Sequence, residues 1–232
     1  MPDSSPNARA TAKPVPSAEP SKLPRRERER LRQREEILAA ALELFSEKGF
    51  HRVRMQDIAR KAEFAVGTLY RFFKDKEDLY RALVRSRAEH FHSTLKAVLT
   101  KNEREDPVSV LKRYLEAKAN LLAGGVAMLK LYFAETRGAR FSLRAGLDRE
   151  LLQLYEDLLR QLARVFERGI RRKVFRALDP YKLAVALEGM TNGFLQLWVE
   201  QPERYPFDQQ LALILDLFLH GVVIDEQRVQ AR

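Results

Sequence analysis

Cysteine is absent from this chain of 232 residues, which also contains only ten glycines, ten prolines and four histidines. Without a thiol the chain can form no disulfide, thiolate zinc site, iron–sulfur cluster or cysteine nucleophile. His90 and His92 are two residues apart, so on one helix they point in nearly opposite directions and cannot chelate the same ion. We therefore expect no metal and no cofactor.

Motifs of common enzymes and of membrane proteins are also missing. The sequence has no Gly-rich phosphate loop, no HExxH and no ordered set of Ser, His and Asp, so we expect no enzymatic activity. Its polar start lacks the apolar segment of a signal peptide. The most apolar stretch, residues 211–224, is short and contains Asp216 and His220, which predicts a buried helix rather than a membrane span. These absences predict a cytoplasmic protein with no membrane partner.

The chain is strongly basic, with 42 Lys and Arg against 32 Asp and Glu, a net charge of +10 and a pI of about 9.9. Residues 1–87 hold 20 of the basic and 13 of the acidic residues, and so carry +7 of that charge. Such an excess favours a polyanionic partner such as nucleic acid. The first third of the chain is therefore the expected site of nucleic-acid binding.

Residues 1–24 are rich in Pro, Ala and Ser and show no periodicity, which predicts a disordered tail, and residues 226–232 are expected to form a C-terminal tail. Between Lys22 and Arg34 there are seven basic and two acidic residues. The basic segment 25–34 is either a solvated helix face with Arg and Glu pairs or an arm that binds phosphates. The sequence leaves both interpretations open.

Beyond residue 34, apolar residues recur at intervals of three and four, which is typical of helices. The pattern predicts an all-α protein with a small N-terminal bundle over residues 25–80 and a larger bundle over residues 81–225. The first helix is expected to end at Gly49. Further helices are expected at residues 55–62, 65–73, 76–99, 108–123, 126–136, 143–170, 180–200 and 207–223.

Two short helices joined by a few residues are predicted between Met55 and Phe73. Helical geometry places Ala65, Leu69 and Phe72 on the inner face of the second one. Its outer face combines hydroxyls, a guanidinium and a glycine that permits close backbone approach, which suits DNA. This outer face consists of Gly67, Tyr70, Arg71 and Lys74, with Val66 and Thr68 beside it.

The chain resembles the DNA-binding domain of the TetR family of bacterial transcriptional regulators in the run MQDIARKAEFAVGTLYRFFKDKEDLYRALV, which follows AALELFSEKGF. The most specific parts are GTLY at residues 67–70 and KDKEDL at residues 74–79. The resemblance is strong over residues 34–87 and weaker in FAETRG, FSLRAGLD and GIRRKVFRALDP. It implies a homodimer with a three-helix DNA-binding domain, whose third helix enters the major groove, and a larger bundle that binds a small effector.

The resemblance also implies roles for single residues. Gln56 is the implied base reader, and Tyr70 and Lys76 are the implied phosphate ligands. Lys76 is unusual on physical grounds too, because a cation in the first turn opposes the helix dipole and a nearby phosphate would relieve that conflict. An ordinary exposed lysine is the alternative. The implied groove-lining residues are Val66, Gly67, Thr68 and Arg71.

Three positions depart from the family pattern. Arg54 stands where Ser or Thr usually caps the second helix, Glu63 where the turn usually has Gly, and Ala65 where the third helix often begins with Ser. A non-Gly residue at positive φ costs about 1 to 2 kcal/mol, and a missing cap about 1. We expect either a marginally stable domain or a different turn, and we hypothesise that Arg54 contacts a phosphate.

Two apolar stripes in the last third predict either core or, from the resemblance, a dimer interface of two helices from each subunit. They consist of Leu183, Leu187, Met190, Phe194 and Leu197, and of Leu211, Leu215, Phe218, Leu219 and Val222. The candidate effector contacts combine apolar bulk with occasional polar tips, although each could be an ordinary core residue. These candidates are Met128, Tyr132, Phe133, Tyr155, Asn192 and Trp198.

Together these features predict a ligand-responsive repressor that binds a pseudo-palindromic, double-stranded operator as a dimer and is released by a small molecule. Two alternatives stay open. One is a basic protein that binds DNA without sequence preference, mainly through residues 25–34. The other is a helical ligand-binding protein or enzyme that has lost operator recognition.

Overall fold

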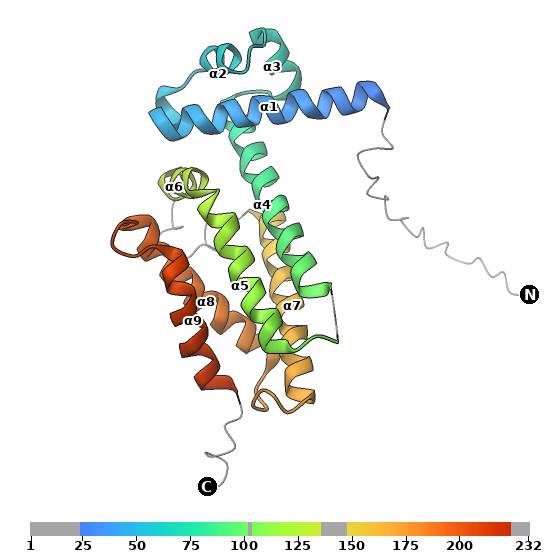
Figure 1. Ribbon diagram of the computed structural model, residues 1–232. Helices are drawn as coiled ribbons and strands as arrows, with labels where there is room; N and C mark the ends of the chain where they lie inside the picture. Colours follow the sequence, from blue (N-terminus) through green and yellow to red (C-terminus); the bar gives the residue numbers. More distant parts are fainter. Residues whose placement is uncertain (1–23, 102–103, 136–147, 224–232) are drawn as a thin grey trace, which may run out of the picture.

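A computed structural model describes residues 24–101, 104–135 and 148–223, which form nine α-helices and a short 3-10 helix (Figure 1). Within these ranges there is no β-strand, only an isolated bridge between Phe175 and Val223, so the all-α prediction is confirmed. None of the described helices is long and apolar enough to cross a bilayer. The predicted tails lie outside the described residues, apart from residue 24.

The N-terminal domain consists of α1 (Arg25–Lys48), the 3-10 helix η2 (Phe50–Arg52), α2 (Met55–Lys61), α3 (Val66–Phe72) and the first turns of α4 (Lys76–Thr100). α1 ends as predicted at Gly49, whose φ of 79° lies in the left-handed region that suits glycine. The domain closes around its own apolar core. This core includes Ile37, Leu38, Ala41, Phe45, Ile58, Leu69, Leu79 and Leu83, none more than 1% exposed.

The turn between α2 and α3 keeps a left-handed residue even though it lacks glycine. Glu63 has a φ of 59°. The turn is closed by the N–H of Phe64, which donates to the carbonyl of Ala59 at 2.9 Å. At the start of α2 the Arg54 side chain accepts no hydrogen bond; instead Asp57 Oδ2 accepts from the Arg54 N–H at 3.0 Å. The turn therefore has a left-handed residue at Glu63, and a non-Gly residue in this conformation is strained.

The C-terminal domain consists of the rest of α4 together with α5 (Pro107–Ala123), α6 (Val126–Glu135), α7 (Arg149–Arg171), α8 (Pro180–Glu200) and α9 (Phe207–Val222). α8 spans the predicted residues because Asp179 accepts from the N–H groups of Tyr181 and Lys182 while Pro180 opens the helix. α7 begins after the N-cap Asp148, later than predicted, and residues 143–147 lie outside the described ranges.

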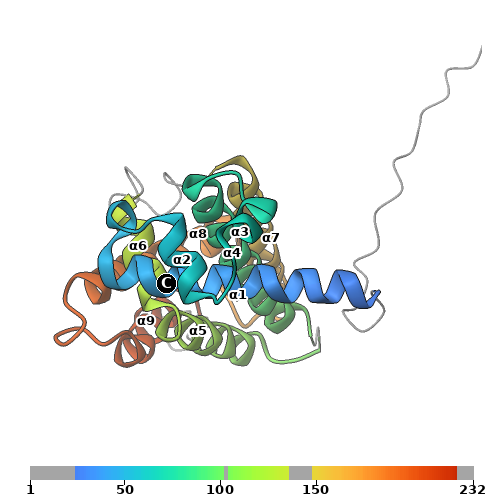
Figure 2. The same cartoon turned by 90° about the horizontal axis from the view of Figure 1, so that it is seen from above.

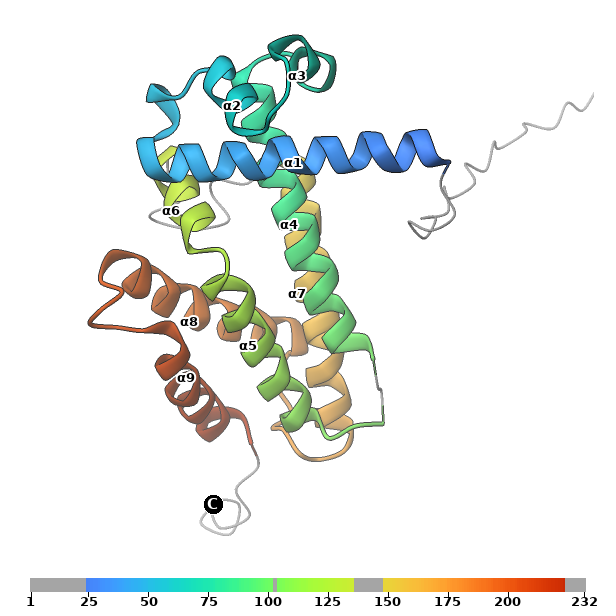
Figure 3. The ribbon, with the colours of Figure 1, turned by 45° about the horizontal axis from the view of Figure 1, so that its top comes forward.

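α4 joins the two domains without a break (Figure 3). Leu79 and Leu83 lie in the N-terminal core, whereas Leu95 and Leu99 lie in the core of the larger domain. The N-terminal part of α4 therefore belongs to one core and its C-terminal part to the other. Seen from above, α1 lies across the larger bundle and its N-terminal half projects beyond it (Figure 2).

Candidate DNA-binding surface and ligand cavity

The outer face of α3 is exposed as predicted. Gly67, Arg71 and Lys74 are exposed, Tyr70 is 52% exposed, and Leu69 on the opposite face is fully buried. The inward position predicted for Ala65 is wrong: it is the exposed N-cap residue of α3. Cap residues precede the helix, so helical periodicity does not apply to them.

The other implied DNA contacts lie on or beside the same two helices. Gln56 and Arg54 are exposed at the start of α2, while Val66 and Thr68 are half-buried in the first turn of α3. α2 and α3 form the end of the molecule that is farthest from the lower part of α9 (Figure 1). That these side chains contact DNA stays a prediction.

Lys76 is held inside its own domain. Its Nζ donates to the carbonyls of Phe50 at 2.9 Å and Val53 at 3.1 Å, and lies 4.4 Å from the centre of the Phe50 ring. These acceptors relieve the conflict with the dipole of α4, so the physical argument for a phosphate at Lys76 no longer holds. Two of the three ammonium protons are used, and phosphate binding at this residue stays a prediction.

The basic segment at the start of α1 forms the paired charges of the first predicted interpretation, and phosphate binding by this segment stays a prediction. Arg32 forms ion pairs with Glu29 at 2.7 Å and Glu36 at 2.9 Å, which is the solvated face of paired charges. Two arginines lie over aromatic rings at the end of α3, Arg30 over Phe72 and Arg34 over Phe73. Arg25, Arg26 and Arg28 are exposed, and they neither form an ion pair with a described residue nor lie over an aromatic ring of one.

A cavity of about 500 Å³ lies beneath the DNA-binding domain, lined by residues of α4, α5, α6, α7 and α8 and by Leu42 of α1. Four of the effector candidates line it: Met128, Tyr132, Tyr155 and Asn192. Phe133 and Trp198 do not line it, which agrees with the alternative that each is an ordinary packing residue. Trp198 packs in a separate cluster with Ala119, Leu122 and Leu195, and Phe133 packs edge-on against Tyr132.

Sequence reasoning missed the charged residues of this cavity. Lys118 Nζ lies 2.9 and 3.0 Å from the two carboxylate oxygens of Glu188, and both residues are 2% exposed. The hydroxyl of Tyr114 donates to the same carboxylate at 2.5 Å. Burial, and then the charge of Glu188, raise the pKa of Tyr114. The available signal was a charged residue within an apolar stripe, at Lys118 in α5 and at Glu188 in α8.

A third charged residue of the cavity, Arg87 on α4, has no such partner. Its Nε is buried and forms no hydrogen bond with the described part of the chain. His92, which also lines the cavity, donates at 2.9 Å to Asp157 of α7, and Lys96 donates to the same carboxylate at 2.8 Å, so that these contacts tie α7 to α4. Hydrogen bonding from Lys96, followed by that from His92 and Gln161, lowers the pKa of Asp157 to about 2.

The predicted dimer stripes face mainly into the subunit, which matches the core alternative that the sequence left open, and their part in a dimer interface stays a prediction. Four residues lie in the core of the subunit: Leu183, Leu187, Phe218 and Val222. Five are partly buried against that core: Met190, Phe194, Leu211, Leu215 and Leu219. Leu197 alone of the predicted set is exposed, at 41%. The other faces of α8 and α9 carry the exposed apolar residues Tyr181, Val185, Leu213 and Leu217.

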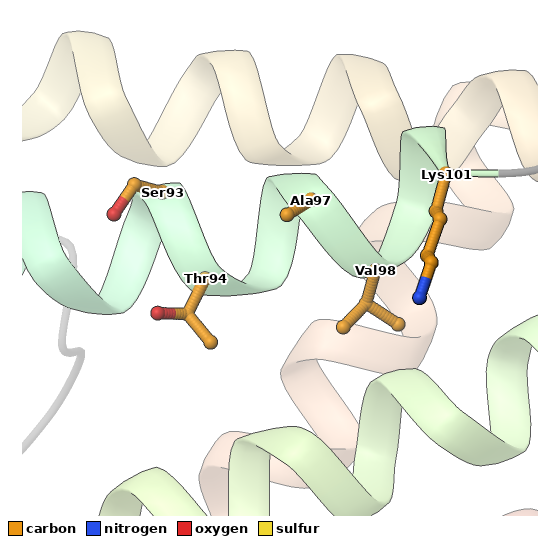
Figure 4. A pocket seen from close by; sticks show the side chains of 5 residues that line it. All are labelled: Ser93, Thr94, Ala97, Val98 and Lys101. Atoms are coloured by element: carbon orange, nitrogen blue, oxygen red, sulfur yellow. The ribbon is translucent and has the colours of Figure 1, made fainter. Parts of the chain in front are cut away.

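A second hollow lies on the surface of α4 and is lined by that helix alone (Figure 4). Its residues are Ser93, Thr94, Ala97, Val98 and Lys101. Because no other element contributes a side chain, it has the character of an open depression rather than of a binding site. No group of His, Asp or Glu among the described residues is arranged to hold a metal ion.

Comparison with known proteins agrees with this geometry. Residues 37–83 match the model of the bacterial regulatory proteins of the tetR family. The fatty acid metabolism regulator protein of Bacillus subtilis is 25% identical over 188 residues, which cover 81% of this chain and 94% of that protein.

Solved structures share the fold over similar lengths. The repressor SmeT of the Stenotrophomonas maltophilia multidrug efflux pump SmeDEF superposes with a TM-score of 0.66 and 26% identity, over 83% of this chain and 91% of SmeT. A Saccharomonospora viridis protein solved in complex with choline gives 0.67 and 22% identity, over 84% of this chain and 100% of its own. Residues 37–83 therefore form a DNA-binding domain of the type found in the tetR family of bacterial regulatory proteins, and the chain shares the fold of SmeT over most of its length.

Proposed function

We propose that this protein is a cytoplasmic repressor that binds double-stranded DNA as a homodimer and is released by a small molecule in the cavity. The proposal rests on one observation: helices that contribute to the core of the DNA-binding domain also line the cavity. Met128 and Tyr132 of α6 line the cavity, while Leu131 belongs to the N-terminal core. Leu42 of α1 and Val84 of α4 also line it. A ligand therefore contacts helices that hold the DNA-binding domain.

Release requires that the ligand bind one arrangement of these helices better than the other. α6 packs against α1, and α4 continues from the N-terminal core along the cavity. A ligand that displaces α6 or tilts α4 moves α3 relative to the larger bundle. The fold can hold a small molecule, as the Saccharomonospora viridis protein with choline illustrates.

The exposed apolar faces of α8 and α9 support dimerisation. On α8, Tyr181, Val185 and Leu197 lie at helical spacing with the exposed Gly189 and Gly193 between them. No atom outside the helix backbone lies within 4 Å of a side chain added at either glycine, so a second helix can approach closely there. A two-fold dimer presents two copies of α3, and recognition helices about 34 Å apart read a pseudo-palindrome.

The test is selection of duplexes from a random pool, followed by footprinting and fluorescence anisotropy on the selected site at constant salt. We expect a protected pseudo-palindrome and, for Arg71→Ala, at least ~10-fold weaker binding, because the guanidinium that would bind a base or a phosphate is removed. Arg160→Ala is the matched control, because Arg160 is an exposed arginine of α7 that forms no ion pair with a described residue. This variant should bind the selected duplex as tightly as the wild type does. Equal protection of random duplexes would contradict sequence-specific repression and favour a non-specific DNA-binding protein.

A further inference from the structure

We infer that the cavity selects an amphipathic carboxylate, with its anionic head at Arg87 and its apolar body along the leucine-rich wall. The inference rests on the proposed effector role of this cavity, and it adds the chemical class of the ligand. It comes from the distribution of charge among the lining residues.

Arg87 provides an unused donor in the wall. It lies on α4 in the half-buried class, and its buried Nε has no acceptor among the described residues. No described carboxylate forms an ion pair with it. The twelve residues 136–147 contain no Asp or Glu either. The buried Nε–H has lost hydration without compensation, and a guanidinium matches the two oxygens of a carboxylate.

The remaining charges of the lining cancel. Glu188 is the one carboxylate among the described lining residues, and its two oxygens are occupied by Lys118 and by the hydroxyl of Tyr114. Lys118 and Glu188 cancel, so Arg87 leaves the Lys, Arg and Glu side chains of the lining with a single positive charge. A cationic ligand would meet repulsion, and a neutral one would leave the guanidinium unsatisfied.

The rest of the cavity wall is mainly apolar and therefore favours a ligand with an apolar body. Side chains of four helices converge there, and their burial by a ligand favours hydrocarbon over polar groups. They include Phe91, Leu121, Leu129, Leu154 and Leu158. A ligand that satisfies both parts carries one anionic end and an otherwise apolar skeleton.

The test compares three probes on the full chain by titration calorimetry, each below its micelle-forming concentration: decanoate, decan-1-ol and decyltrimethylammonium. We expect decanoate to bind at least ~10-fold more tightly than the other two. Arg87→Met should weaken decanoate binding by at least ~10-fold, since a hydrogen bond to a charged group is removed. Arg81→Met, an exposed arginine on the same helix, should leave decanoate binding unchanged.

Thermal melting separates loss of the site from loss of the fold. Without ligand, Arg87→Met should melt at or above the wild-type temperature, because a buried donor without a partner is replaced by an apolar group of similar length. Decanoate should raise the melting temperature of the wild type and not that of the variant. A variant that retains the decanoate shift overturns the inference.

The outcomes also separate this inference from the proposed function. Decanoate that binds through Arg87 without releasing the selected duplex supports the ligand class and contradicts ligand-released repression. Decan-1-ol or decyltrimethylammonium that binds as tightly as decanoate and releases the duplex supports repression and overturns the ligand class. Absence of decanoate binding at millimolar concentration overturns the ligand class as well.

Discussion

At the scale of single residues, Glu63 shows a conflict between local conformation and sequence. Its φ of 59° lies in the region that glycine enters without strain, and no described residue forms an ion pair with its carboxylate. The side chain therefore contributes strain to the helix-turn-helix without a visible interaction that offsets it.

We predict that Glu63→Gly raises the free energy of unfolding by about 1 kcal/mol, because the left-handed strain is removed and only part of the gain is lost to the greater freedom of the unfolded chain. Urea denaturation followed by circular dichroism measures this change. Glu89→Gly on the exposed side of α4 is the control and should destabilise by about 1 kcal/mol, because glycine is a poor helix former. Equal destabilisation by both substitutions would contradict the argument.

Asp157 is predicted to make stability depend on acid pH. Its pKa is lowered from 3.8 to about 2 by Lys96, His92 and Gln161. Because the folded-state pKa lies below the ordinary value, its stabilisation is complete above about pH 5 and is lost as the pH falls toward 2. Water screens part of the effect, so we expect about 1 kcal/mol.

The measurement compares wild type with Asp157→Asn by urea denaturation at pH 6 and at pH 3. The variant should be less stable at pH 6, and the difference should shrink at pH 3, because Asp157 is then largely protonated in the unfolded chain while it is still mostly ionised in the native state. Glu167→Gln, on the exposed side of the same helix, should change stability little at either pH. A difference that is constant with pH would show that the charge of Asp157 is not its source.

At the scale of elements, α1 extends past the domain that it helps to form (Figure 3). Aromatic rings at the end of α3 and ion pairs within α1 position Arg30, Arg32 and Arg34, whereas Arg25, Arg26 and Arg28 form neither kind of contact with described residues. A rigid helix with free cations can follow the backbone of DNA beside the operator without reading its sequence.

Replacement of Arg25, Arg26 and Arg28 by Ala should weaken binding to all duplexes equally. It should also reduce the slope of log affinity against log salt by about 1 for each phosphate that these arginines neutralise in the wild-type complex. Fluorescence anisotropy between 50 and 300 mM salt measures both effects. Replacement of Arg160, Arg164 and Arg171 by Ala removes the same charge from α7 and should leave the slope nearly unchanged. Identical slopes for the two triple variants would assign the effect to net charge rather than to α1.

At the scale of the whole molecule, α8 and α9 pack against each other and leave an apolar surface on the outside of the subunit. Leu213 and Leu217 of α9 are 44% and 51% exposed. Monomeric proteins seldom expose neighbouring large apolar residues, which supports a second copy of the chain as their partner.

We predict that Leu217→Glu makes the protein monomeric at micromolar concentration, as light scattering would measure, because a carboxylate would be buried between the subunits. The fold should persist, since this side chain is exposed within one subunit. Leu31→Glu is the control, since it replaces a leucine of α1 that is 48% exposed, and this variant should remain dimeric. A monomeric wild type would exclude the paired recognition helices of the proposed operator complex.

Local patterns in the sequence were sufficient for the helices and for the outer face of α3. Caps, glycines and intervals of three and four act within a few residues, so α8 spans the predicted residues and Leu69 points inward. The same patterns did not determine which side of an almost entirely apolar helix is core. Leu183 and Val185 lie two residues apart in α8, yet the first is buried and the second exposed.

The sequence by itself determined that the chain is helical, basic at its start, and built around a helix-turn-helix of the TetR type. Only the tertiary structure decided the rest. Lys76 meets carbonyls 23 and 26 residues away, and Lys118 meets Glu188 at a separation of 70 residues. Arg87 remains without an acceptor among the described residues beside the cavity. Such pairings depend on how helices pack, because distant side chains meet only when the chain has folded, and no local periodicity encodes them.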